Sequence, residues 1–193
     1  MFVIAGLGNP GAEYDLTRHN VGYMVLDRFA AIYNTRIRTV QCQALTANIQ
    51  PKEGEAFLLA KPYTFMNLSG DSIAPLLKKL QIPSEKLIVI HDDLDLDCGI
   101  VRIKTDGSTA GHKGLKSIAE RLGTTNFIRI RVGISRPYEK EDVVEYVLSK
   151  FRSGERALLD EALDTACKMV LDYMNKGFAY TANKFHRKNS TEV

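Results

Sequence analysis

The apolar residues at the start of the chain form a short continuous run, Phe2 to Ala5, which ends in a loop rich in Gly and Pro. Similar runs at 56–60 and 87–90 are also followed by polar loops. A short apolar run with such boundaries predicts a strand that is buried on both faces, as in a parallel sheet. Loops at the carboxyl ends of such strands carry binding and catalytic residues in many α/β proteins. The pattern therefore predicts a functional site at one edge of a sheet.

The remaining hydrophobic positions follow two other periods. Apolar and polar residues alternate, as in half-buried strands, over 44–50, 100–105 and 127–134. Apolar residues at helical spacing predict helices over about 20–33, 71–80, 115–122 and 153–177. Strands that alternate with helices favour an α/β fold. We therefore predict one domain over residues 1–193, with three α/β/α layers around a twisted, mixed and largely parallel sheet, and a frayed basic tail from about Lys184.

Length and composition agree with this prediction and narrow the class of protein. The 193 residues suit a single domain, and 45% hydrophobic with 25% charged residues is typical of a soluble globular protein. No apolar run approaches the roughly 18 residues of a membrane span, and the N-terminus lacks the basic start of a secretory signal. The three cysteines share no C-x-x-C spacing, which indicates reduced thiols. We expect a cytoplasmic protein without a membrane partner.

The positive charge is concentrated in one part of the chain. Residues 98–140 contain nine basic and three acidic side chains, whereas the whole chain carries a net charge of only +3. Over 100–105 and 127–134 the basic residues alternate with apolar ones, so each strand is expected to present a basic face to solvent or ligand. A basic sector beside a polar cleft suits a polyanion, although charged residues also simply solvate a surface.

Two of the polar loops supply a candidate acid–base pair. His19 follows the first apolar run, and Asp92 follows the third. A carboxylate that accepts a hydrogen bond from one ring nitrogen fixes the tautomer of a histidine and leaves the other nitrogen free to take a proton. The pair therefore predicts a general base acting on water, against the alternative of a structural histidine. His91 is expected to point away from Asp92 and to be structural, and His186 is expected to have no specific role.

Three further residues are candidates for ligand binding. Asn9 and Asn67 each offer donor and acceptor groups, which suits a peptide-like carbonyl or amide, although asparagine also often caps loops. His112 opens a helix after a Gly-rich loop, where an anion or a second group of a ligand would bind. Ser69 lies nearby without a G-x-S-x-G motif around it, so a serine nucleophile is not predicted.

The first loop also matches the dinucleotide-binding pattern Gly6-x-Gly8-x-x-Gly11. That pattern requires a helix to open at the third glycine, so that its N-terminus meets the pyrophosphate. Here Pro10 lies inside the motif, and no helical periodicity follows directly. These departures count against a dinucleotide site. A nucleotide-dependent oxidoreductase stays only as an alternative, which binding of NAD or flavin would support.

The acidic run after the third strand resembles the start of a calcium loop. Its pattern is Asp93-x-Asp95-x-Asp97, but Cys98 and Lys104 stand where that loop needs Gly and a bidentate Glu. A two-carboxylate magnesium site stays an alternative. We predict no metal and no cofactor, with Asp95 and Asp97 making turn hydrogen bonds.

Five motifs, in order along the chain, together resemble one family. They are GLGNPGAEYDLTRHNVG (6–22), KPYTFMNLSG (61–70), HDDLDL (91–96), GIVRIKTDGSTAGHKGL (99–115) and IRVGISRP (130–137). Over nearly its whole length the chain is similar to bacterial-type peptidyl-tRNA hydrolase. The resemblance implies a single-domain α/β/α monomer that needs no metal or cofactor. Its implied activity is hydrolysis of the ester between a peptide and the 3′-terminal ribose of tRNA.

The resemblance also implies roles for individual residues. His19 would be the base that activates water, and Asp92 would orient it. Substrate would contact Asn9, Tyr14, Met66, Asn67, His112 and Lys113, and tRNA would contact Arg102, Lys104 and Arg131. Lys113 departs from the family, which commonly has Asn at this point, and lysine cannot accept a hydrogen bond. A non-catalytic RNA-binding protein on the same scaffold stays an alternative, although it would not need His19 or Asp92.

Overall fold

Seven strands form one mixed sheet in the computed structural model, which describes residues 1–137 and 142–186. The strands are β1 (Phe2–Gly6), β2 (Thr39–Gln41), β3 (Ala44–Ile49), β4 (Phe57–Pro62), β5 (Leu87–Asp93), β6 (Val101–Lys104) and β7 (Ile128–Gly133). Their order across the sheet is β2-β3-β4-β1-β5-β7-β6. The four central strands are parallel, while β3 is antiparallel to β2 and β4, and β6 is antiparallel to β7. The predicted mixed, largely parallel sheet is confirmed, with β2 as an addition.

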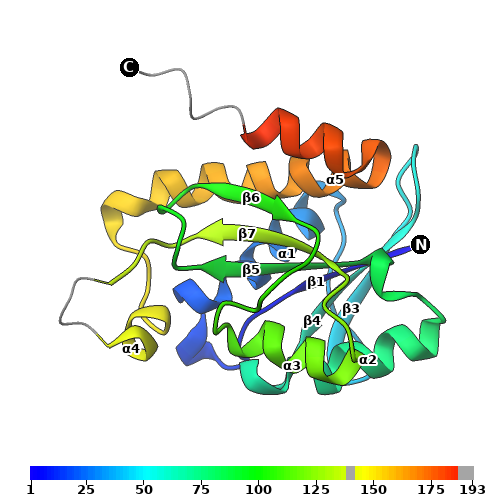
Figure 1. Ribbon diagram of the computed structural model, residues 1–193, viewed down its shortest axis with the longest axis horizontal. Coiled ribbons are helices and arrows are strands. Elements are labelled where there is room, and N and C mark those ends of the chain that lie inside the picture. Colours follow the sequence, from blue (N-terminus) through cyan, green and yellow to red (C-terminus); the bar gives the residue numbers. More distant parts are fainter. Residues whose placement is uncertain (138–141, 187–193) are drawn as a thin grey trace.

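Helices cover both faces of this sheet (Figure 1). They are α1 (Val21–Ile32), α2 (Ser69–Leu80), α3 (Lys113–Leu122), the short α4 (Val143–Val147) and α5 (Arg156–His186). Because successive side chains of a strand point to opposite faces, Ile4 packs with α1 and α5, while Val3 and Ala5 pack with α2 and α3. Two apolar cores therefore flank the sheet, which gives the predicted α/β/α layers. Single 3₁₀ turns directly precede α1, α2 and α5, at Arg18–Asn20, Met66–Leu68 and Ser153–Glu155, and two more lie at Ala12–Tyr14 and before β5 at Ser84–Lys86.

Helix α1 packs directly on the first strand, and two glycines permit this close approach. A Cβ atom on Gly22 would lie 2.4 Å from the backbone nitrogen of Leu7, and a Cβ on Gly6 would lie 2.3 Å from the carbonyl oxygen of Gly22. The first glycine of the dinucleotide-like pattern thus serves helix packing. At the third glycine only the 3₁₀ turn Ala12–Tyr14 begins, so the helix N-terminus that a pyrophosphate needs is missing there.

The C-terminal helix differs from its prediction. Gly177 has φ 76° and ψ 179°, so the first helical segment does end there as expected, but a second segment continues to His186. Lys184 pairs with Asp172 at 2.6 Å, and Nε2 of His186 accepts a hydrogen bond from the backbone N–H of Ile103 at 3.3 Å. His186 therefore caps the free edge of β6, and the prediction that it has no specific role is wrong. The rest of the predicted tail lies outside the described residues.

Among the described residues, no helix combines the length and the apolar character that crossing a bilayer would need.

Candidate active site

A cavity of about 790 Å³ opens at the carboxyl ends of the parallel strands. The loops that follow β1 and β4 supply Asn9 and Met66 to its lining, the end of β5 supplies Asp92, and the turn before α1 supplies His19. Helix α4 forms a wall of the same cavity and lies beside the ends of β5 and β7 (Figure 1). Three separated segments of sequence thus meet at one edge of the sheet, as the apolar runs predicted.

Asp92 is the centre of this arrangement. Its Oδ1 atom lies 2.8 Å from Nδ1 of His19 and 3.0 Å from Nε2 of His112. Burial raises the pKa of the Asp92 carboxyl, but the two histidines outweigh this effect and hold the pKa below its usual value. The carboxylate is therefore ionised, and one of its oxygens accepts hydrogen bonds from two imidazoles.

The two histidines differ in what their second ring nitrogen does. Nδ1 of His112 accepts hydrogen bonds from the backbone N–H groups of Gly114 and Leu115, at 3.1 and 3.3 Å, because His112 is the N-cap of α3. A nitrogen that accepts these bonds carries no proton, so the proton of neutral His112 lies on Nε2 and is donated to Asp92. Both nitrogens of His112 are therefore occupied.

In His19 only one nitrogen is occupied. Nδ1 donates to Asp92, and within the described part of the chain Nε2 has no hydrogen-bond partner. The ring lines the cavity and is 12% exposed. An imidazole held by a carboxylate at Nδ1, with a bare Nε2 in a cavity, has the arrangement of a general base.

His19, Asp92 and His112 also place three ligand atoms within 4.8 Å of one another, which is the spacing of a metal site. Coordination by Nε2 of His112 would require a lone pair on that nitrogen and a proton on Nδ1. Nδ1 would then face two backbone N–H donors, and the cap of α3 would be lost. The group does not fit a metal ion, which supports the prediction of a metal-free site.

Asn9 is oriented by a network of amide hydrogen bonds. Its Oδ1 atom accepts from the backbone N–H of Met66 at 2.8 Å, so its NH₂ group is left free of partners among the described residues. Asn20 holds the Asn9 backbone from both sides, by accepting from its N–H at 2.8 Å and donating to its carbonyl at 2.9 Å. The NH₂ group of Asn9, which lines the cavity, is a fixed donor for a carbonyl oxygen of a ligand. Sequence reasoning missed Asn20, because its only signal was a position beside His19.

Comparison with known proteins places this geometry in a family. Residues 3–192 match the family model described as peptidyl-tRNA hydrolase. The chain is 44% identical to the peptidyl-tRNA hydrolase of Bacillus subtilis (strain 168) over 190 residues, which is 97% of this chain and the whole of that protein. The crystal structure of peptidyl-tRNA hydrolase from Acinetobacter baumannii superposes with a TM-score of 0.90, at 36% identity over 97% of this chain and 95% of that one. The chain belongs to the peptidyl-tRNA hydrolase family.

A second relative has the same coverage. The peptidyl-tRNA hydrolase of Thermoanaerobacter sp. (strain X514) is 43% identical over 186 residues, which is 96% of this chain and the whole of that protein. The family resemblance drawn from the five motifs is confirmed.

The other expected substrate residues are placed unequally. Met66 is buried in the cavity wall, while Asn67 and Lys113 are exposed on its lining. Tyr14 lies outside the lining, and its carbonyl oxygen accepts from the Thr17 hydroxyl at 2.8 Å. Ser69 donates its hydroxyl to the Met66 carbonyl at 2.8 Å, which agrees with a structural role. The contacts that these residues make with substrate stay predictions.

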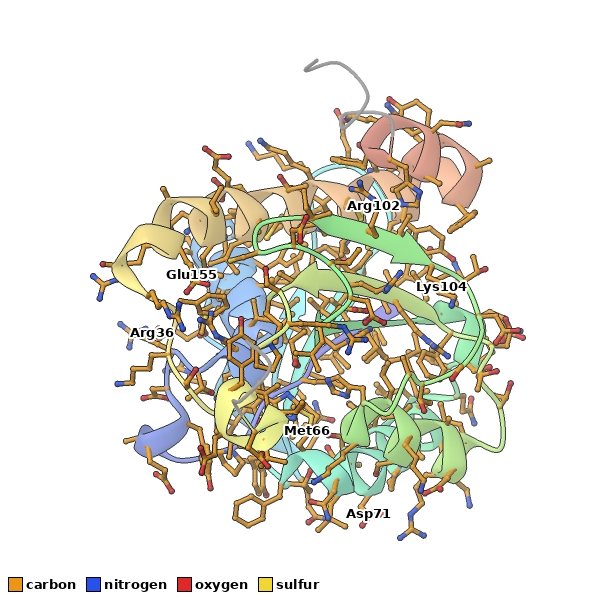
Figure 2. All side chains as sticks on the ribbon, turned by 60° about the vertical axis from the view of Figure 1, so that its left-hand side comes forward. Arg36, Met66, Asp71, Arg102, Lys104 and Glu155 are labelled. Carbon is orange, nitrogen blue, oxygen red and sulfur yellow. The ribbon has the colours of Figure 1, made fainter. Side chains whose placement is uncertain are left out.

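The basic residues of the 98–140 sector are placed unequally. Lys104 and Arg131 line the cavity, and Arg102 lies outside the lining on β6 (Figure 2). Arg131 pairs with Asp93 at 2.6 Å. Arg129 is only 2% exposed and donates to the carbonyl oxygens of Gly107 and Ser108, both at 2.7 Å. The expectation of a uniformly basic face on β7 is therefore wrong at Arg129, because the 107–108 loop covers this side chain.

His91, predicted to point away from Asp92, lines the same cavity and contacts the site, and its structural role stays a prediction. Its Nδ1 donates to the backbone oxygen of Asp92 at 2.6 Å, and its ring packs edge-on to His112 with centroids 4.9 Å apart. Burial, together with the neighbouring His112, lowers the pKa of His91 to about 3. His91 is therefore a neutral support behind His112.

Proposed function

We propose that this protein hydrolyses the ester that joins a peptide to the 3′-terminal ribose of tRNA, and so recycles tRNA from drop-off or stalled translation. The observation that carries the proposal is the pair His19–Asp92, with Nδ1 held at 2.8 Å and Nε2 open to the cavity. Membership of the peptidyl-tRNA hydrolase family supports the same substrate. We also propose that it acts as a monomer, without a protein partner, in the cytoplasm.

In the proposed reaction, His19 takes a proton from water as the water oxygen attacks the ester carbonyl. Ionised Asp92 stabilises the imidazolium that forms. The new carbon–oxygen bond replaces the ester bond, and the proton passes to the leaving ribose oxygen, so that the imidazole ends neutral. An ester leaving group needs less assistance than an amide, so one base with a few oriented donors suffices.

Asn9 and Asn67 serve the carbonyl oxygen in this mechanism. The NH₂ group of Asn9 is fixed before substrate arrives, because Met66 and Asn20 hold the rest of the residue. A donor that is oriented in advance stabilises a developing oxyanion without further reorganisation. Asn67 is exposed on the lining, where its amide group binds the peptide.

The tRNA is held by cations at the cavity and on the adjacent strand. Lys104 and Lys113 have no ion-pair partner in the described ranges, whereas Arg131 is paired with Asp93. Contacts to phosphate release counterions, so binding of tRNA weakens as the salt concentration rises. Lys113, at the first residue of α3, adds a positive charge at the cavity.

The test is incubation of the protein with N-acetylated aminoacyl-tRNA, with and without EDTA. We expect cleavage that the chelator does not change, loss of cleavage in His19→Ala, and unchanged tRNA binding in that variant. Cleavage that His19→Ala retains would contradict the role of His19. Binding of tRNA by the wild-type protein without any cleavage would favour the non-catalytic RNA-binding alternative.

A further inference from the structure

Arg18, the residue before His19, is almost completely buried. It is 1% exposed and does not line the cavity. Its Nη2 nitrogen donates to Oε2 of Glu155 at 2.8 Å. Its guanidinium carbon lies 4.5 Å from the ring centroid of Tyr146 and 4.8 Å from that of Phe151. The side chain thus leaves the active site and enters a pocket between two aromatic rings and a carboxylate.

All of these partners belong to one segment of the chain, residues 146–155. The backbone joins the same segment, because the N–H of Arg18 donates to the carbonyl of Ser149 at 2.9 Å and Thr17 forms a β-bridge with Lys150. Glu155 comes directly before α5 (Figure 2). The segment starts within α4, whose Val143, Val144 and Val147 line the cavity. Arg18 therefore connects the turn that carries His19 to the wall of the cavity that α4 forms.

The form of this contact indicates that Arg18 fixes the relative position of the segments it joins, more than it adds to the stability of the fold. Nε and Nη1 of Arg18 are buried without a hydrogen-bond partner in the described structure. A buried ion pair with unsatisfied nitrogens is poor evidence for stabilisation, because an apolar side chain of similar volume often does as well. A planar guanidinium, by contrast, stacks on aromatic rings and bonds a carboxylate at a fixed angle.

We infer that Arg18 is a positioning residue for hydrolysis. It holds Nε2 of His19 at a fixed position relative to the cavity wall that α4 forms. Substrate seated against α4 then meets the base at the distance that proton transfer requires. A misplacement of about 1 Å at a reacting group lowers the rate by roughly 10²-fold. The inference rests on the proposed function, since it concerns the same base.

The test compares kcat and KM for N-acetylated aminoacyl-tRNA in Arg18→Met, Arg18→Lys and Glu155→Gln. We expect kcat to fall by roughly 10- to 100-fold in Arg18→Met, with KM changing much less. Arg18→Lys keeps the charge but not the planar stack, so its kcat should lie between those of Arg18→Met and the wild type. Glu155→Gln should lower kcat in the same direction.

Two controls separate positioning from general stability. Arg28→Met removes a surface arginine that bonds Asp160 and Asp164 of α5 on the α1 side of the sheet. Val170→Ala weakens the core of α5, at a fully buried position far along the sequence from the site. Both should keep kcat at temperatures where they are folded, as judged by circular dichroism.

The inference is overturned if Arg18→Met has the kcat of Val170→Ala at equal fraction folded. If Arg18→Met does not fold, unchanged kcat in both Arg18→Lys and Glu155→Gln overturns it instead. Failure of the wild-type protein to cleave the substrate would contradict the proposed function itself, which is a different outcome from equal rates among active variants.

Discussion

Two regions of the molecule each bring a histidine to the same oxygen of Asp92. In both, the histidine lies just before a helix and a buried arginine lies nearby. The turn before α1 presents His19, and the loop before α3 presents His112. A buried arginine supports each region: Arg18 bonds Glu155, and Arg129 bonds the carbonyl groups of residues 107 and 108. The regions differ at the second ring nitrogen, which is bare in His19 and caps α3 in His112.

The comparison shows that residue type and proximity to a carboxylate do not identify a base. Both rings have the same acid partner, but only His19 keeps a lone pair for a proton from water. In His112 both nitrogens are occupied, because Nε2 bonds Asp92 and Nδ1 caps the N-terminus of α3. The helix cap therefore determines which of the two histidines can do chemistry.

The largest effect is expected where the two regions meet, at Asp92→Asn. Because both rings bond the same oxygen, the amide oxygen of asparagine can still accept from both, but the amide removes the negative charge that stabilises the imidazolium. We expect kcat to fall by roughly 10²- to 10⁴-fold. Single-turnover cleavage of N-acetylated aminoacyl-tRNA measures this, with tRNA binding by the same variant as the control. A kcat close to the wild-type value would show that the charge of Asp92 does not stabilise the imidazolium.

A smaller effect is expected from His112→Asn, which alters one region alone. Asparagine is a good N-cap, so α3 still begins normally, but the second hydrogen bond to Asp92 is lost. We expect kcat to fall by about tenfold, because Asp92 is then less firmly oriented while His19 is intact. His112→Ala serves as the comparison, since it also loses the cap, at about 1 kcal/mol of stability. A loss as large as that of His19→Ala would assign the proton transfer to both histidines.

The smallest effect is expected at His91, which packs against His112, and it concerns how the free energy of unfolding depends on pH. The pKa of His91 is lowered to about 3 in the folded protein, so below the ordinary value the unfolded chain binds a proton that the folded chain does not. The free energy of unfolding therefore falls as the pH drops from about 6.5 towards 3. In His91→Phe this dependence should be shallower, by up to about 1.4 kcal/mol per pH unit. Urea unfolding at several pH values tests this, and an unchanged slope would contradict it.

The sheet and the meeting of His19 with Asp92 could be predicted from sequence, because apolar runs mark parallel strands and the ends of parallel strands share an edge. The roles that were missed depend on distant partners. Arg18 and Glu155 are 137 positions apart, and no local sequence pattern predicts their contact. Arg129 alternates like an exposed residue, and only the loop folded over it shows that it is buried. The free nitrogen of His19 likewise becomes evident only from the hydrogen bonds that its own ring makes in the folded protein.

The most direct test of the account is the tautomeric state of the two rings, measured by long-range ¹H–¹⁵N correlation on ¹⁵N-labelled protein at about pH 8, where histidines are ordinarily neutral. We expect the proton of His19 on Nδ1, with a bare Nε2, and the proton of His112 on Nε2, with a bare Nδ1. Assignment of the rings follows from the spectra of His19→Ala and His112→Asn. A proton on Nε2 of His19 in the free protein would contradict its role as the base.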